Sequence, residues 1–278
     1  MRLLRALGVL ATTAAFVIGG ATTGSAAPPS NGSASAMGWY LALGDSLAAG
    51  YQPGSGVDLD GGYADDVLAG VRATVPKTTL VNLACPGERS TTLVSGGICS
   101  YEEGSQLDQA LEFLHAHGRY TRLITLQVGA NDVQRCVDRA TLTIDPACIQ
   151  AGMADVATYL PMALGKLRAE APNAQVVVLN YYNPFLATWL LGNQSLAQQS
   201  AVLQGTLNGI IGGAASASGA ALADVATAFR STDWTVVGGV PTNVAYICRY
   251  TWMCSRFDIH ANDAGYALIG ETVVARLE

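Results

Sequence analysis

The sequence contains little charge and has no basic run. Only 13% of its 278 residues are charged, and the formal net charge at pH 7 is −6. A protein that binds nucleic acid needs a positive surface to neutralise phosphates. We therefore expect no nucleic-acid partner.

Sequence patterns typical of metal and cofactor sites are also missing. The cysteines never occur as the Cys-x-x-Cys pair that zinc sites favour. His115 and His117 lack a His-Glu-x-x-His motif, and two positions apart they do not share one face of a helix. No glycine-rich loop of the Walker or dinucleotide type is present. We expect both histidines at the surface or in packing roles, and neither a metal nor a cofactor.

The N-terminal segment has the pattern of an export signal. It begins with Arg2 and Arg5, continues with an apolar run over residues 6–20, and ends in small residues that suit cleavage after Ala26. The apolar run is shorter than the roughly 20 residues that span a membrane, although a retained anchor is the alternative. We therefore expect residues 1–26 to be a signal peptide, the protein to be secreted, and the mature chain to have no stable membrane span.

Cleavage after Ala26 would remove two of the 15 basic residues and none of the 21 acidic residues, which changes the formal charge from −6 to −8. Residues 27–37 are rich in Ser, Ala, Pro and Gly, so we expect a flexible lead-in. The remaining residues, 38–278, suffice for one domain with a sizeable core and show no internal repeat. We expect this catalytic domain to be a monomer.

Short apolar runs alternate with longer helical patterns along this domain, which is typical of parallel strands joined by helices. The expected strands are residues 40–43, 79–84, 123–128, 175–179 and 221–225. The expected helices are residues 63–75, 106–115, 150–171, 196–211 and 263–277. The predicted fold is α/β: a three-layer α/β/α sandwich around a mostly parallel five-stranded sheet.

All six cysteines follow the predicted signal peptide. An even number of cysteines behind an export signal indicates disulfides. Six cysteines permit fifteen pairings, but three pairs lie close together in the sequence. We expect the disulfides Cys85–Cys99, Cys136–Cys148 and Cys248–Cys254. A disulfide that closes a loop of about 15 residues contributes up to about 3 kcal/mol in the chain-entropy model.

A serine follows the first expected strand directly. The tetrapeptide Gly-Asp-Ser-Leu at residues 44–47 places Ser46 where the strand ends. Ligands of such sheets bind beyond the carboxyl ends of the strands, and Gly87 and Asn131 follow two further expected strands at the same rim. A serine hydroxyl can attack a carbonyl carbon there while N–H groups stabilise the developing negative charge. Each motif alone is most often a simple turn; together they indicate an ester hydrolase.

Four segments in this order resemble the SGNH, or GDSL, hydrolase family: residues 44–50, 85–87, 129–132 and 258–266. The chain is most similar to the family's secreted actinobacterial esterases and lipases, whereas the Gly-x-Ser-x-Gly pentapeptide of α/β-hydrolases is absent. The resemblance implies that Ser46 is the nucleophile and His260 its general base. It also implies an oxyanion hole made by the backbone N–H groups of Ser46 and Gly87 and by the Asn131 side chain.

The residue that orients the histidine departs from the family pattern. The family places an aspartate three residues before the histidine, where this chain has Phe257, while Asp258 stands only two residues before His260. Either Asp258 reaches the imidazole from a different loop, or a backbone carbonyl near Phe257 orients His260 in a Ser-His dyad. An orienting group is needed because the positive end of the following helix disfavours the imidazolium. Asp258 is the expected third catalytic residue.

Two groups of apolar side chains bear on the substrate. Seven aromatic and aliphatic residues within 181–191 could line an acyl cleft, form a lid or pack in the core. Trp234, Tyr246, Tyr250 and Trp252 could contact an acyl chain or a sugar ring. The expected function is a secreted esterase or lipase acting on a small-molecule or lipid-like ester. A carbohydrate O-deacetylase and a catalytically inactive binding protein are the alternatives.

Overall fold

The structure, a computed structural model, describes residues 37–54, 56–57, 62–138, 140–141 and 143–278. The expected signal peptide, residues 1–26, lies outside these residues. So does the expected lead-in, residues 27–37, except for Met37, which begins the first strand. All of the described residues belong to one compact unit of the chain.

Five parallel strands form the central sheet in the order β4-β1-β5-β8-β9. They are β1 (Met37–Gly44), β4 (Lys77–Asn82), β5 (Thr121–Gln127), β8 (Gln175–Leu179) and β9 (Ala221–Ala223). β1 lies between β4 and β5, with Leu41 opposite Val81 on one side and Ile124 on the other. The inner strands are buried on both faces, which explains their nearly continuous apolar sequences. The five predicted strands are confirmed.

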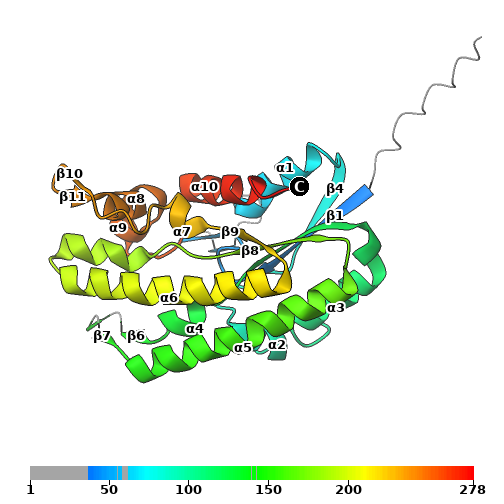
Figure 1. Cartoon of the computed structure of the whole chain (residues 1–278), viewed down its shortest axis with the longest axis horizontal. Coiled ribbons are helices and arrows are strands. Elements are labelled where there is room, and N and C mark those ends of the chain that lie inside the picture. The colour runs from blue at the N-terminus through cyan, green and yellow to red at the C-terminus, as the bar shows by residue number, and fades with distance from the viewer. Residues whose placement is uncertain (1–36, 55, 58–61, 139, 142) are drawn as a thin grey trace, which may run out of the picture. The chain divides into compact units, whose positions relative to one another are not determined.

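Helices cover both faces of this sheet (Figure 1). On one face lie α1 (Tyr63–Arg72) and α10 (Asp263–Val274), which pack against each other. On the other lie α3 (Gln106–His117), α5 (Pro146–Glu170) and α6 (Gln194–Ser218). The predicted three-layer sandwich is therefore confirmed.

The helix ends differ from the prediction, most of all at the start of α5 and the end of α6, where local contacts set them. α5 begins at Pro146 rather than at residue 150, because Asp145 accepts hydrogen bonds from the first N–H groups and proline suits the first helical position. α6 continues to Ser218 rather than ending at residue 211, and it stops where Gly219 adopts a left-handed conformation.

Short elements at the ends of the strands were not predicted. The helical ones are α2 (Ser90–Ser95), η1 (Gly118–Tyr120), α4 (Ala130–Gln134), η2 (Pro184–Leu191), α7 (Val225–Ala228), α8 (Thr242–Tyr250) and α9 (Met253–Arg256). Three antiparallel pairs join β2 (Tyr51–Gln52) to β3 (Gly56–Val57), β6 (Val137–Asp138) to β7 (Thr143–Ile144), and β10 (Val236–Val237) to β11 (Val240–Pro241). Most of these elements are too short to show a hydrophobic period.

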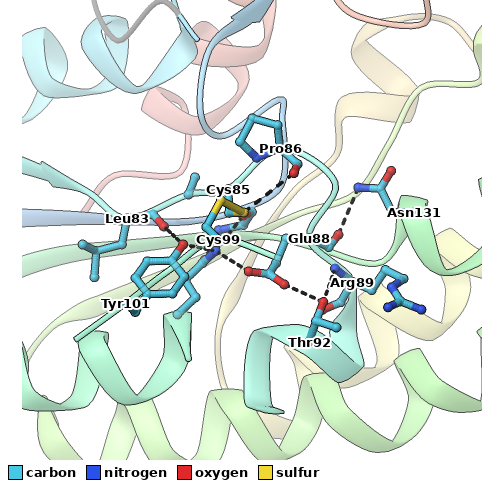
Figure 2. The surroundings of a disulfide bond; sticks show 12 residues. Leu83, Cys85, Pro86, Glu88, Arg89, Thr92, Cys99, Tyr101 and Asn131 are labelled. Atoms are coloured by element: carbon cyan, nitrogen blue, oxygen red, sulfur yellow. Dashed lines mark hydrogen bonds between the residues drawn. A yellow bond between two sulfur atoms is a disulfide. The ribbon is translucent and has the colours of Figure 1, made fainter. Parts of the chain in front are cut away.

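All six cysteines are paired, as Cys85–Cys99, Cys136–Cys148 and Cys248–Cys254. The first disulfide closes the loop after β4 that contains Gly87 (Figure 2). The second ties the residue just before β6 to the first turn of α5, and the third joins α8 to α9. The three short pairings expected from the sequence are the ones present.

The two early histidines take surface and packing positions. The His117 ring packs against Trp39 and Phe113, with ring centroids 5.0 and 4.8 Å away. His115 is exposed beside Glu170. Among the described residues, no three His, Cys, Asp or Glu side chains are placed to hold a metal ion together. Within the same ranges no helix has the length and apolar character needed to cross a membrane.

Candidate active site

β1 ends in a tight turn that presents a serine. Gly44 has a φ of 137°, and a Cβ there would lie 2.1 Å from the carbonyl oxygen of Gln127, so only glycine fits. Gln106 of α3 holds the same residue: its Oε1 accepts from the Gly44 N–H at 2.6 Å, and its Nε2 donates to the Gly44 carbonyl at 3.0 Å. The Asp45 N–H donates to the Gln127 carbonyl at 2.9 Å. These contacts fix the position of Ser46.

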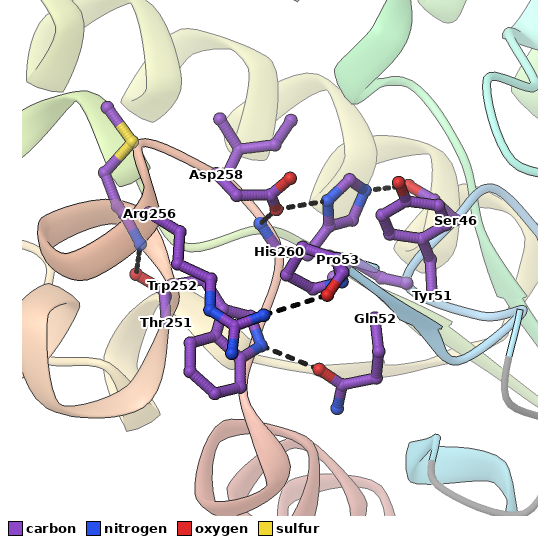
Figure 3. A network of polar contacts seen from close by, with 12 residues as sticks. Ser46, Tyr51, Gln52, Pro53, Thr251, Trp252, Arg256, Asp258 and His260 are labelled. Carbon is purple, nitrogen blue, oxygen red and sulfur yellow. Dashed lines mark hydrogen bonds and ion pairs between the residues drawn. The ribbon is translucent and has the colours of Figure 1, made fainter. Parts of the chain in front are cut away.

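Three side chains form a hydrogen-bonded series at this turn (Figure 3). Ser46 Oγ lies 2.8 Å from His260 Nε2, and His260 Nδ1 lies 2.7 Å from Asp258 Oδ1. Ser46 and His260 are 214 residues apart in the sequence, so only the fold brings them together. The side chains of His260 and Asp258 are 15% and 25% exposed, which shelters the contact while leaving it accessible.

Asp258 reaches the imidazole because the loop before α10 is sharply turned. Phe257 has a φ of 53° in the left-handed region and its side chain is exposed. Asp258 Oδ1 also accepts the backbone N–H of His260 at 2.9 Å, so one oxygen binds both the main chain and the ring of the histidine. Of the two alternatives left by the sequence, the structure places the Asp258 carboxylate against the ring.

Neighbouring residues hold the histidine loop in place. The backbone N–H of Trp252 donates to the His260 carbonyl at 2.9 Å, and the Tyr182 hydroxyl donates to the Ile259 carbonyl at 2.7 Å. The Tyr51 ring lies against the imidazole with centroids 4.3 Å apart (Figure 3). These contacts come from three different segments, and they restrict the imidazole to one orientation.

Two of the three expected oxyanion-hole donors, Ser46 and Asn131, lie at the cleft. Within the described part of the chain, neither the Ser46 N–H nor the Gly87 N–H has a hydrogen-bond partner. Gly87 has a φ of 86°, which favours glycine. Asn131 Nδ2 donates one hydrogen to the Glu88 carbonyl at 3.0 Å (Figure 2), and its second hydrogen remains for another acceptor. Asn131 and Ser46 line one cleft together with His260, whereas Gly87 does not line it.

A model of the GDSL-like Lipase/Acylhydrolase family matches residues 42–268, which is most of the chain. The chain belongs to this family. As a member it is a carboxylic ester hydrolase of the GDSL type, and the predicted resemblance is confirmed. Lipase 1 of Streptomyces coelicolor is 28% identical over 244 residues, which cover 82% of each of the two chains.

Solved structures of GDSL and related hydrolases share the fold. An extracellular lipase from Streptomyces rimosus is 22% identical with a TM-score of 0.57, and the match covers 86% of this chain and 98% of that one. An acetylxylan esterase from Geobacillus stearothermophilus is 13% identical with a TM-score of 0.54, covering 86% of this chain and 94% of that one. At these identities the likeness establishes the α/β sandwich.

Buried polar residues behind the GDSL turn escaped the sequence analysis. Asp132 accepts from the Ser90 N–H at 2.9 Å and from its hydroxyl at 2.6 Å, which ties α4 to α2. The Glu88 carboxylate accepts from Thr92 and, at 3.1 Å, from Gln106 Nε2. Burial raises the pKa of both carboxyls. Asp132 belongs to the motif at residues 129–132, but neither its burial nor that of Glu88 can be read from the sequence, because only the fold buries them.

The aspartate of the GDSL turn is also buried. Asp45 Oδ2 accepts the Tyr181 hydroxyl at 2.6 Å, and its Oδ1 accepts the Leu47 N–H at 3.0 Å. The side chain of Asn208 on α6 binds both the N–H and the carbonyl of Tyr181, at 3.1 and 2.8 Å. Burial raises the pKa of Asp45 to about 7, although both hydrogen bonds oppose this shift.

We expect Asp45→Asn to flatten the dependence of stability on pH. In the wild type the folded carboxyl binds its proton with a pKa of about 7, against 3.8 without burial. The folded state therefore holds the proton more tightly, and stability falls as pH rises through this interval. The asparagine has the same shape and no charge. Its Tm, measured from about pH 4 to pH 8, should equal or exceed that of the wild type at pH 8 and vary less.

A constant difference in Tm between Asp45→Asn and the wild type across that range would contradict this expectation. Asp138→Asn is a suitable control, because Asp138 is an exposed carboxyl whose pKa is lowered by backbone N–H groups of its turn. The stability that Asp138 contributes is lost as pH falls. As pH rises, the Tm of Asp45→Asn should therefore increase relative to the wild type, and the Tm of Asp138→Asn should decrease relative to the wild type.

The aromatic segments divide between the cleft, the core and the surface. Tyr181, Tyr182 and Pro184 line the cleft at Ser46. Tyr181, Tyr182 and Leu186 are buried, whereas Leu190 and Leu191 are exposed, so residues 181–191 serve both the cleft and the core. Trp234, Tyr246, Tyr250 and Trp252 do not line this cleft; they pack against other rings or against arginines.

Proposed function

We propose that the protein is a secreted serine esterase that cleaves carboxylic esters through an acyl-enzyme on Ser46. The observation that carries this proposal is the hydrogen-bonded series from Ser46 through His260 to Asp258, with distances of 2.8 and 2.7 Å. A nucleophile, a base and a group that orients the base stand within hydrogen-bonding distance of one another, which is the arrangement that activates a hydroxyl.

In the first step Ser46 Oγ attacks the carbonyl carbon of the ester while His260 Nε2 takes the hydroxyl proton. Asp258 holds the Nδ1–H and stabilises the imidazolium that forms. The bond from the carbonyl carbon to the alcohol oxygen then breaks, and His260 returns the proton to the leaving alcohol. In the second step water attacks the acyl-serine, His260 takes one of its protons, and the carboxylic acid is released as Ser46 recovers its hydrogen.

The negative charge that develops on the carbonyl oxygen needs hydrogen-bond donors already in place. We assign this role to the N–H groups of Ser46 and Gly87 and to Asn131 Nδ2. The contact from Asn131 to the Glu88 carbonyl supports the assignment, because it orients the amide before substrate arrives. The disulfide Cys85–Cys99 closes the loop that contains Gly87 and Glu88.

Secretion is supported by two independent observations. The first residues have the basic start, apolar run and small-residue cleavage site of a signal peptide. All six cysteines of the chain are paired in disulfides, which persist in oxidising compartments outside the cytosol. We propose that the mature protein begins near Ala27 and acts outside the cell.

An alkyl p-nitrophenyl phosphonate tests the proposed nucleophile directly. We expect mature protein, residues 27–278, to release one p-nitrophenol per chain and to carry the phosphonyl group on the peptide that contains Ser46. Ser95→Ala, which removes an exposed serine hydroxyl from α2, should label like the wild type. A folded chain that stays unlabelled, or that is labelled elsewhere, would show that Ser46 is not the nucleophile.

A further inference from the structure

Two further spaces lie beyond the Ser46 cleft, and each shares lining residues with the one before it. The cleft shares Gln134 with a neighbouring cavity whose walls include Val133, Phe185 and Leu196. That cavity in turn shares Ile149 and Leu203 with an open groove on the surface. The three spaces therefore lie one beyond another, from Ser46 to the surface. We call them together the path.

The groove lies between the β6–β7 hairpin, the first half of α5 and the middle of α6. It has a volume of about 550 Å³. Met153 of α5 and Val202 of α6 line it, and Val202 is 71% exposed. None of the described residues that line the groove or the neighbouring cavity carries a charge. Aliphatic surface left open beside a reactive group indicates a binding site for an apolar ligand.

The walls of this path are held in place by covalent and close backbone contacts. The disulfide Cys136–Cys148 ties the segment before β6 to α5. At Gly152 a Cβ would lie 2.2 Å from the carbonyl oxygen of Asp132, so α5 packs directly on the backbone of α4. These contacts fix the walls before a substrate arrives.

We propose that this path holds the acyl chain of the substrate, which makes the preferred substrate an ester of a medium- or long-chain fatty acid. The inference rests on the proposed acyl-enzyme at Ser46. An ester whose carbonyl lies at Ser46 can extend its carbon chain past Gln134 into the groove. The space is small at the start, about 20 Å³ at Ser46 and about 40 Å³ beyond Gln134. A single alkyl chain fits such a passage better than a sugar ring.

Two matched pairs of variants test the path. Met153→Trp fills the groove, and Met162→Trp makes the same change at an exposed position of the same helix. Val202→Asp places a charge at the mouth of the groove, and Val237→Asp does so at an equally exposed valine on β10. Hydrolysis of p-nitrophenyl acetate, butyrate, octanoate and palmitate is measured for each variant and for the wild type, together with phosphonate labelling of Ser46.

For the wild type we expect kcat/KM to rise with acyl length by up to about fourfold per methylene group that enters the path, the factor that burial of one such group provides. Met153→Trp and Val202→Asp should keep the acetate activity and the Ser46 label. Their kcat/KM on octanoate should fall by at least about tenfold, a loss that the exclusion of fewer than three methylene groups from the path accounts for. Met162→Trp and Val237→Asp should match the wild type.

Two different failures can be told apart. A wild type that hydrolyses acetate with Ser46 labelled, but shows no gain with chain length, would overturn the acyl path and leave the proposed esterase standing. Equal effects of the groove variants and their controls would do the same. A wild type without turnover of any of the esters and without the Ser46 label would overturn the proposed function and the acyl path together.

Discussion

We expect Ser46→Ala to abolish ester hydrolysis, with kcat on p-nitrophenyl butyrate lowered by about 10⁵-fold or more. The substitution removes the attacking oxygen, which lies 2.8 Å from His260 Nε2. The residual rate would come from the hydrogen-bond donors and from substrate binding alone.

The loss should be chemical rather than structural. Ser46 is only 9% exposed but contributes a single small hydroxyl, so Ser46→Ala should fold with a Tm close to that of the wild type. Ser95→Ala, the exposed control on α2, should retain full activity. Residual turnover by folded Ser46→Ala above about one per cent of wild type would contradict the role of Ser46, since the expected loss is far larger.

Asp258→Ala is expected to lower kcat by about 10⁴-fold with little change in KM. Asp258 Oδ1 accepts from both the ring and the backbone N–H of His260, at 2.7 and 2.9 Å. Without the carboxylate, the imidazole loses the contact that keeps Nε2 directed at Ser46 and that stabilises the imidazolium. Steady-state kinetics on p-nitrophenyl butyrate provide kcat and KM separately.

Asp258→Ala distinguishes the two ways of orienting the histidine, and its control is Phe257→Ala. The control leaves the carbonyl of residue 257 in place and removes a side chain that is 69% exposed, so we expect activity near that of the wild type. Near-normal kcat in Asp258→Ala would instead exclude Asp258 from the mechanism. That result would favour a Ser-His dyad oriented by a backbone carbonyl.

Regular elements were predictable because their patterns are long. The three inner strands are apolar runs buried on both faces, and α10 places Tyr266, Ile269 and Val273 on one buried face behind an Asn262 cap. Boundaries shifted where a local contact decides them, as at the Asp145 cap of α5. The short rim elements escaped prediction because segments of two to nine residues rarely complete a hydrophobic period.

The candidate site was predictable only in part, and for a related reason. Ser46 and Asn131 were found because each follows a strand in a recognisable motif. Gln106, by contrast, contacts Gly44 across 62 residues, and the Tyr181 hydroxyl reaches Asp45 across 136. No local pattern records such contacts, since they depend on how loops and helices return to the end of β1.

By itself the sequence determined the α/β class, the family, the nucleophile candidate and the short cysteine pairings, because each depends on residues close together or on motifs in order along the chain. Only the tertiary structure decided whether the Asp258 carboxylate or a backbone carbonyl faces His260, which side chains hold the GDSL turn, and where a largely apolar groove lies beyond the Ser46 cleft. Those features arise where segments far apart in the chain meet at the rim of one parallel sheet. Their geometry depends on strand order and on burial, which a linear pattern does not contain.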